Sequence, residues 1–255
     1  MRRFLPFIIT GIVFLLAVGG GFLLFRVKSA VTPLKIAEGT PGAEPAHIRG
    51  SNNAQVTLEE FGDYQCAPCG LLAGTLLKIE HKYGSRIRLV FRQFPLRMHA
   101  HGMTAATAAE AAGLQGHFWE MHDLLFENAL SWGKDTLRPR RPVSASPPIV
   151  LQDESTPSAK ETFIGYAAKI GLDQERFKKD MESQEVKARI EADQERGVSM
   201  GVDRTPVLLI DGVRVPFTSL KLETLQTLID DALNGKPPAP ETPGANPDPT
   251  PTPLP

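Results

Sequence analysis

One short arrangement constrains this chain more than any other feature: a strand-like run, two cysteines and a helix-like run, in that order. The run 54–61 alternates apolar and polar residues, as a half-buried strand does. After Cys66 and Cys69, apolar residues recur at helical spacing as far as Gly84, a helix stop signal. A second strand-like run, 86–96, follows. This order predicts two parallel strands joined by a crossover helix within an α/β fold.

The middle of the chain has a different pattern. From about 99 to 198 the sequence is mainly helical: an alanine-rich run is followed by a helix with an apolar stripe at 118–129. After an irregular, proline-containing stretch at 134–158, two further segments, 161–171 and 173–197, are expected to be helices. Strand character returns at 205–217, where Asp211-Gly212 favours a tight hairpin turn. The segment 220–235 predicts a last amphipathic helix with a C-cap signal. The sequence therefore predicts an α/β domain over 46–235 with a helical insertion.

The first residues predict a membrane anchor. Residues 4–25 carry no charge and, at helical rise, are long enough to cross a hydrocarbon core of about 30 Å. A cleaved secretory signal is the competing interpretation, but its apolar region normally spans about 7–15 residues and ends at a small-x-small site. Here the position two residues before Ala30, which such a site would fill with a small residue, is occupied by Lys28. We therefore expect an uncleaved transmembrane helix preceded by a short cytoplasmic stub, residues 1–3.

The flanking segments indicate how the domain is placed. Residues 26–45 are rich in proline, glycine and alanine and predict a linker, and 236–255 predicts a proline-rich disordered tail. Positive charges on both sides of the apolar segment are close to balanced, so charge does not fix the orientation. A cysteine pair that cycles through a disulfide suits an extracytoplasmic domain. We expect a single-pass protein of the cell (inner) membrane whose domain faces the periplasm or extracytoplasmic side.

Composition and residue counts exclude several classes of site. A formal net charge of −1 gives no basic surface field for nucleic acid. The chain has only 2 cysteines, which is half of a structural zinc site. The histidines at 99 and 101, and those at 117 and 122, do not have the same-face spacing of a helical ligand pair. We therefore expect no metal and interpret these histidines as surface or core-edge residues.

The cysteine pair itself favours redox chemistry. A bridge closing so short a loop removes little entropy from the unfolded chain, so Cys66-Cys69 is a poor structural staple. Cys66 at a helix N-terminus would have its thiolate stabilised by backbone N–H groups and the helix dipole. Pro68 fits a first helical turn, where its missing N–H costs no helical hydrogen bond. We expect Cys66 to be the nucleophile and the more buried Cys69 to resolve the mixed disulfide.

At this point the residues resemble a known family. The segment "EEFGDYQCAPCG" is similar to the active site of the DsbA-like, thioredoxin-fold disulfide oxidoreductases, in particular their membrane-anchored bacterial branch. "LQGHFWEMHDLLF" and "GVDRTPVLLIDG" extend the resemblance over about 45–233. The resemblance implies a thioredoxin-like fold with an inserted helical subdomain, preceded here by one N-terminal transmembrane helix. It also implies that the protein needs no organic cofactor.

The resemblance also implies roles for three further residues. Thr205 and Pro206 match a cis-proline loop that faces the cysteines and binds substrate peptide. From the residues alone, Thr-Pro is only a turn or strand-entry signal, because most such bonds are trans. Glu60 matches a buried acid that moves a proton to or from the resolving thiol. Its neighbour Glu59 should point to the other sheet face, so at most one of the two is expected to be buried.

The direction of electron flow stays open. Ala67 and Pro68 lie between the cysteines and tune the redox potential, and here proline takes the second place, as in thioredoxins. The leading hypothesis is an oxidase that forms disulfides in exported proteins and is re-oxidised by a membrane partner of the DsbB or vitamin K epoxide reductase type. One alternative is a reductase or isomerase of exported proteins. Another is a non-catalytic module that binds metal or protein.

Overall fold

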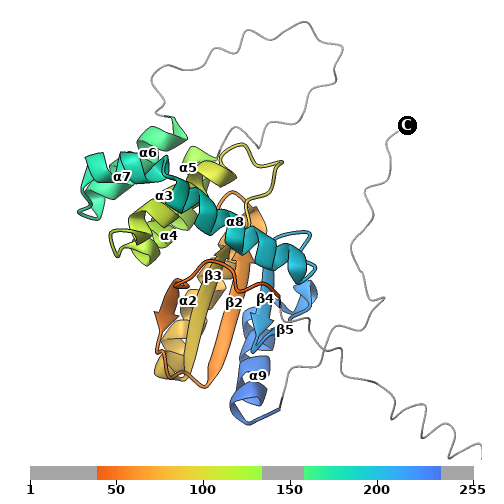
Figure 1. Ribbon diagram of the computed structural model, residues 1–255. Helices are drawn as coiled ribbons and strands as arrows, with labels where there is room; N and C mark the ends of the chain where they lie inside the picture. Colours follow the sequence, from red (N-terminus) through yellow and green to blue (C-terminus); the bar gives the residue numbers. More distant parts are fainter. Residues whose placement is uncertain (1–38, 134–157, 237–255) are drawn as a thin grey trace, which may run out of the picture. The chain divides into compact units, whose positions relative to one another are not determined.

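The computed structural model describes residues 39–133 and 158–236 (Figure 1). The predicted stub and anchor, the linker up to residue 38, the segment 134–157 and the tail from 237 lie outside the described residues. Within the described ranges, no helix combines the length and apolar character needed to cross a bilayer.

A five-stranded sheet forms the centre of the domain, in the order β1-β3-β2-β4-β5. The cysteine-proximal strand β2 (Val56–Gly62) pairs in parallel with β3 (Ile87–Gln93), as the strand, helix, strand order predicts. The other neighbours are antiparallel, including the hairpin of β4 (Val207–Ile210) and β5 (Val213–Arg214). Its turn residues Asp211 and Gly212 have φ of 48° and 80°, which confirms the predicted tight turn.

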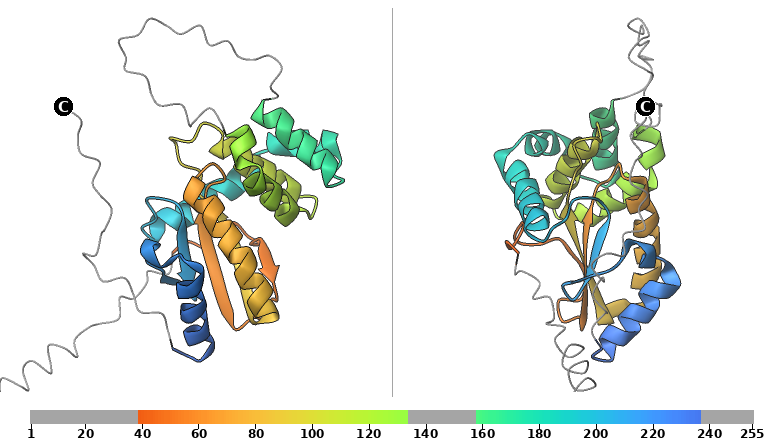
Figure 2. Two further views of the ribbon diagram at one scale, coloured as in Figure 1. Left: turned by 180° about the vertical axis from the view of Figure 1, so that it is seen from behind. Right: turned by 90° about the vertical axis from the view of Figure 1, so that its right-hand side faces the viewer.

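Two helices cover one face of the sheet (Figure 2, left). They are α2 (Ala67–Tyr83) and α9 (Leu222–Leu233), and they pack against the strands through buried leucines and isoleucines. Helix α2 ends at Gly84, with φ of 55°, and passes through a 3-10 turn, η1 (Gly84–Arg86), into β3. A second 3-10 turn, η3 (Phe217–Ser219), precedes α9.

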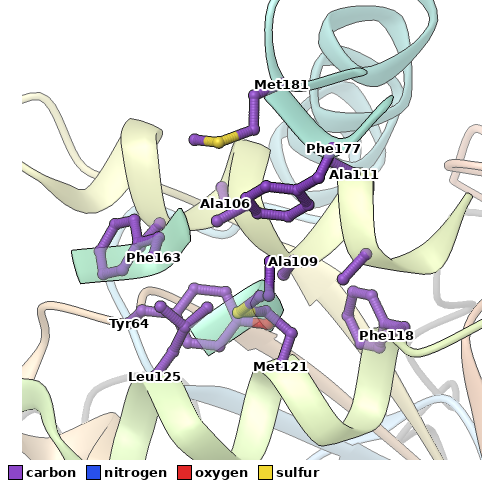
Figure 3. Close-up of a cluster of buried hydrophobic side chains, with 14 of the residues drawn as sticks. Tyr64, Ala106, Ala109, Ala111, Phe118, Met121, Leu125, Phe163, Phe177 and Met181 are labelled. Atoms are coloured by element: carbon purple, nitrogen blue, oxygen red, sulfur yellow. The ribbon is translucent and has the colours of Figure 1, made fainter. Parts of the chain in front are cut away.

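The helical insertion lies at one end of the sheet (Figure 1) and has its own core (Figure 3). Buried alanines of α3 let neighbouring helices approach closely, and large side chains such as Phe163 and Phe177 fill the space between them. Tyr64, from the loop before Cys66, belongs to the same cluster and joins it to the sheet. The insertion comprises α3 (Gly102–Gly113), α4 (Phe118–Glu127), α5 (Ala129–Trp132), α6 (Ala159–Lys169), α7 (Gln174–Met181) and α8 (Gln184–Ser199).

Two predicted helices are divided in the structure. The stripe expected from 118 to 129 is interrupted at Asn128, whose Nδ2 donates to the Leu124 carbonyl at 2.8 Å and ends α4. The charged run 173–197 forms α7 and α8 instead of one helix. Ser183 divides it, because its hydroxyl accepts from the Val186 N–H at 3.2 Å and caps α8.

Residues 39–50, assigned by sequence mainly to a linker, fold against the domain. β1 (Ile48–Gly50) pairs with β3, and the preceding segment 39–47 follows α8. Three arginine side chains donate to carbonyls of this segment: Arg92 to Ala43 at 2.8 Å, Arg189 to Glu44 and Pro45 at 3.1 and 3.0 Å, and Arg196 to Thr40 at 2.8 Å. These charge-assisted hydrogen bonds hold in place a segment that has few large apolar side chains to bury.

Candidate active site

The two cysteines lie where β2 leads into α2. Cys66 is the N-cap of α2, and its carbonyl accepts from the N–H groups of Cys69 at 3.0 Å and Gly70 at 3.2 Å. Cys66 is 7% exposed and Cys69 is fully buried, in the order that the sequence predicts. Both thiols are free, so the structure represents the dithiol state. Ala67 and Pro68 occupy the first helical turn and are exposed beside them.

The surroundings of Cys66 favour its thiolate. Hydrogen bonds from the Cys69 thiol and the Cys69 backbone N–H lower the pKa of Cys66 to about 6, although burial and the charge of Asp63 act in the opposite direction. A thiol with this pKa is mostly ionised at neutral pH and is a good nucleophile. Cys66 is therefore the thiol of the pair that is ready to attack.

Cys69 has the opposite environment. Burial, its hydrogen bond to Cys66 and the nearby Glu60 carboxyl all raise the pKa of the Cys69 thiol well above its usual value. The proton of the pair thus stays on Cys69 while Cys66 is ionised. Cys69 needs a proton acceptor before it can attack a disulfide at Cys66.

Glu60 is a buried acid that interacts electrostatically with both cysteines. It lies on β2, is 0% exposed, and neither carboxylate oxygen has a hydrogen-bond partner among the described residues. Burial, with a smaller contribution from the Cys66 charge, raises the pKa of Glu60 to about 8. A carboxyl with this pKa can accept or release a proton near neutral pH.

The expectation that only one of Glu59 and Glu60 would be buried is wrong. Glu59 points to the opposite sheet face as predicted, yet it is only 8% exposed. Two arginines compensate its charge: Arg92 Nε donates to Glu59 Oε1 at 2.9 Å, and Arg196 donates to both oxygens at 2.8 Å. Alternation gives the face of a residue, but a neighbouring helix covers this face and supplies the counter-charge.

The loop before β4 brings Thr205 and Pro206 to the cysteines. Their peptide bond is cis, and the Thr205 carbonyl lies 3.5 Å from Cys66 Sγ. Residues 139 positions apart in sequence thus meet at the reactive sulfur. The resemblance had placed this pair opposite the cysteines, and the geometry brings them together.

Two further interactions near the site had no clear signal in the sequence. Asp63, 1% exposed, accepts from the Gln65 N–H at 2.8 Å, the Leu96 N–H at 2.7 Å and His99 Nδ1 at 2.7 Å. Its own carbonyl accepts from the Cys66 N–H at 3.0 Å, so it shapes the loop that presents the nucleophile. Only its place three residues before Cys66 could have drawn attention to it.

The second interaction joins Tyr64 and His122, whose hydroxyl and Nδ1 lie 3.2 Å apart. His122, expected to be a surface or core-edge residue, is 3% exposed and packed among aromatic rings. Burial lowers the pKa of His122 well below its usual value, so the ring is neutral. Across 39–133 and 158–236, no three His, Cys, Asp or Glu side chains are grouped as metal ligands.

Comparisons with known proteins agree with this geometry. A family model described as Thioredoxin matches residues 43–231. A thioredoxin-like oxidoreductase from Silicibacter pomeroyi DSS-3 is 27% identical, with a TM-score of 0.56, over 74% of this chain and 92% of that one. Oxidised BdbD from Bacillus subtilis shares the fold at 19% identity, with a TM-score of 0.57, over 77% of this chain and 99% of that one.

Curated relatives carry a different name. The Na(+)/H(+) antiporter NhaA of Herminiimonas arsenicoxydans is 34% identical over 204 residues, which is 76% of this chain. An antiporter NhaA 1 from Salinispora arenicola is 29% identical over 84% of this chain. The chain spans only 28% and 31% of these two relatives, so their name describes much longer proteins.

Proposed function

Since this chain belongs to the thioredoxin-fold family of DsbA-like thiol:disulfide oxidoreductases, we propose that it forms disulfides in exported proteins while tethered to the membrane. The observation that carries the proposal is the ionisable Cys66 thiol, placed at the N-terminus of α2 and 3.5 Å from the Thr205 carbonyl. In this position the sulfur meets a backbone segment that can pair with an extended substrate peptide.

The proposed reaction begins from the Cys66-Cys69 disulfide. A substrate thiolate attacks Cys66 Sγ, the bond between the cysteines breaks, and Cys69 leaves as a thiolate that takes a proton from Glu60. A second substrate thiolate then attacks the substrate sulfur of the mixed disulfide, and Cys66 leaves as a thiolate. The substrate is oxidised by two electrons and the enzyme is left as a dithiol. Thr205 and Pro206 would hold the peptide during both steps.

The pKa of Cys66 supports the oxidising direction. At pH 7 a thiol with a pKa of about 6 stabilises the dithiol state by about 1.4 kcal/mol, which raises the reduction potential by about 30 mV. A more stable dithiol makes the disulfide a stronger oxidant. Re-oxidation then requires a membrane partner, and we propose one of the DsbB or vitamin K epoxide reductase type.

A reductase or isomerase acting on exported proteins is the second candidate, and the exposed Ala67-Pro68 pair favours it. The same second-position proline occurs in thioredoxins, whose potentials lie near −270 mV, compared with about −120 mV for DsbA. Equilibration of the purified protein with glutathione buffers separates the two. A potential at or below that of thioredoxin would refute the oxidase.

The proposed location is extracytoplasmic, with 4–25 as the anchor and the domain facing the periplasm or its equivalent. A disulfide-forming enzyme works in an oxidising compartment, and the uncharged 22-residue segment is long enough to span a bilayer. Protease added to intact spheroplasts should remove the domain, and protease protection until lysis would contradict this topology.

Substrate trapping tests the enzymatic proposal. In Cys69→Ala, the Cys66 thiolate can attack a disulfide of an exported protein and form a mixed disulfide, one protein sulfur leaving as a thiolate, but it cannot resolve that bond. Such proteins should therefore accumulate on Cys66 and be identifiable by mass spectrometry after acid quenching. Cys66→Ser combined with Cys69→Ala is the matched control and should trap none. Equal recovery from both variants, or stoichiometric zinc in the purified protein, would instead favour a non-catalytic binding module.

A further inference from the structure

The carboxyl group of Asp63 is enclosed by the loop that follows β3. Its Oδ2 accepts from the Leu96 N–H and from His99 Nδ1, both at 2.7 Å. The His99 N–H donates to the Leu96 carbonyl at 3.0 Å, so a tight turn brings both donors to one oxygen. A Cβ atom at Gly102 would come within 2.9 Å of Asp63 Oδ1, and glycine therefore lets the loop lie this close to the carboxyl group.

A second contact joins this loop to the residue before the nucleophile. The Gln65 side chain accepts from the His101 N–H at 2.7 Å, and the Gln65 N–H donates to Asp63 Oδ1 at 2.8 Å. The Cys66 N–H donates to the Asp63 carbonyl at 3.0 Å. Asp63 therefore connects the loop after β3 to the backbone that presents the reactive sulfur.

His99 is the only basic side chain that pairs with Asp63 among residues 39–133 and 158–236. The Asp63 side chain is fully buried, whereas the His99 ring is 16% exposed. A buried carboxylate destabilises a fold unless hydrogen bonds and a basic partner compensate its charge. The charge also reaches the nucleophile: hydrogen bonds, led by that from Cys69, lower the pKa of Cys66, and the Asp63 charge opposes them. A partner of Asp63 therefore acts on the thiolate through the carboxylate.

We propose that His99 is a positioning residue that sets the reduction potential of the Cys66-Cys69 pair by holding and compensating the Asp63 carboxylate. The proposal rests on the proposed redox function and extends it to a residue outside the dipeptide between the cysteines. With His99 in place, the imidazole N–H offsets part of the carboxylate charge, so the Cys66 thiolate is repelled less. A more stable thiolate favours the dithiol and makes the disulfide a stronger oxidant.

Two substitutions of His99 test the hydrogen bond. His99→Leu removes the donor, whereas His99→Asn keeps a side-chain N–H close to the position of Nδ1. In full-length protein, His99→Leu should raise the pH midpoint of Cys66 alkylation by about 0.5 pH unit, or about threefold in ionisation, because Asp63 is one of several groups that act on this thiol. His99→Asn should restore most of that shift.

His47→Leu is the matched control. His47 pairs with Glu110 at 2.9 Å, and these side chains are 16% and 0% exposed, the same values as for His99 and Asp63. Glu110 keeps a second partner, because Arg189 Nε lies 2.6 Å from the same oxygen. Loss of His47 should therefore lower the melting temperature and leave the alkylation midpoint unchanged.

A double-mutant cycle tests whether His99 acts through the carboxylate. In an Asp63→Asn background no charge remains for His99 to compensate, so His99→Leu should no longer move the midpoint. Glu60, the other acid coupled to Cys66, is unchanged in every protein of the set.

The equilibrium with glutathione gives a second readout. Reduced protein and oxidised glutathione yield the protein disulfide and two molecules of reduced glutathione. His99→Leu should raise this equilibrium constant about threefold, which lowers the potential by about 14 mV at about 30 mV per tenfold. A role in loop stability alone would lower the melting temperature of His99→Leu and leave the potential unchanged.

An unchanged midpoint and potential in His99→Leu would overturn the proposal, and so would an equal shift in both Asp63 backgrounds. A His99→Asn protein with the full shift of His99→Leu would overturn the hydrogen bond as the means of compensation. His99→Phe, which keeps a ring without a donor, replaces His99→Leu if that protein does not fold. A wild-type protein whose cysteines do not exchange with glutathione would instead refute the proposed redox function.

Discussion

Replacing Glu60 with leucine should stabilise the protein and make it a poorer catalyst. The carboxyl is fully buried, its two oxygens have no hydrogen-bond partner among the described residues, and its pKa is raised to about 8 from an ordinary value of 4.5. Leucine is similar in size and removes both the charge and the unpaired oxygens. The substitution therefore isolates the free energy that the fold loses by keeping an acid beneath the cysteines.

The sign follows from proton linkage. The folded state holds the Glu60 proton up to about pH 8, whereas the unfolded chain releases it near 4.5, so Glu60 makes the free energy of unfolding fall as pH rises through this window. At 1.36 kcal/mol per pKa unit, the loss is about 3 kcal/mol at pH 7 and about 4–5 kcal/mol above pH 8.

Guanidinium chloride unfolding of reduced wild-type and Glu60→Leu protein, from pH 4 to pH 9, measures this difference. Cys66 contributes the opposite slope, because its lowered pKa of about 6 adds stability as pH rises toward the ordinary thiol value. Both proteins should therefore also be compared in a Cys66→Ser background, which removes the thiolate. The advantage of leucine should still grow with pH there, because burial is the larger cause of the Glu60 shift.

Three outcomes would refute this reasoning. A pH-independent advantage of leucine would mean that Glu60 has an ordinary pKa in the folded protein. A pH dependence that disappears with Cys66→Ser would mean that the thiolate, and not burial, raises the Glu60 pKa. A destabilised Glu60→Leu protein would mean that the carboxyl oxygens are well solvated and that leucine displaces that water at a cost.

Three further results are expected. Alkylation of Cys66 should have a half-maximal rate near pH 6 and should be absent in Cys66→Ser. Asp63→Asn should move that midpoint to lower pH, because the Asp63 charge raises the Cys66 pKa, and an unchanged midpoint would contradict this. The same substitution should lower the free energy of unfolding by about 1–3 kcal/mol, because Asp63 loses hydrogen bonds. Glu59→Ala should cost about 3 kcal/mol by leaving Arg92 buried without that partner, whereas Glu182→Ala, which breaks an exposed pair, should leave the denaturation midpoint unchanged.

Local sequence patterns were sufficient to predict the centre of the site. Strand alternation, the cysteine spacing and the helix that follows them are all features of neighbouring residues, so they predict the parallel β2 and β3 pair and Cys66 at the start of α2. The greater burial of Cys69 follows from its place one turn inside that helix. Glu60 could be selected because alternation assigns it to one face and the family resemblance supplies its role.

The rest depends on residues that only tertiary packing brings together. His99 reaches Asp63 from 36 positions away, and His122 reaches Tyr64 from 58. Glu59 is buried because an arginine 137 positions away, on α8, neutralises it. No periodicity encodes such pairs. The same holds for the cavity of about 190 Å³ beside Glu60, whose lining residues come from separate helices and strands.

The arginine-bound segment 39–47 protects the N-terminal edge of the domain against forced unfolding. Its carbonyls are held from Thr40 to Pro45 by guanidinium groups of β3 and α8, and the Ala43 N–H donates to Asp193 at 2.8 Å. Tension applied from the N-terminal side would reach these charge-assisted bonds before it reached the sheet. Unfolding of the sheet from this end therefore first requires the guanidinium groups to release the segment.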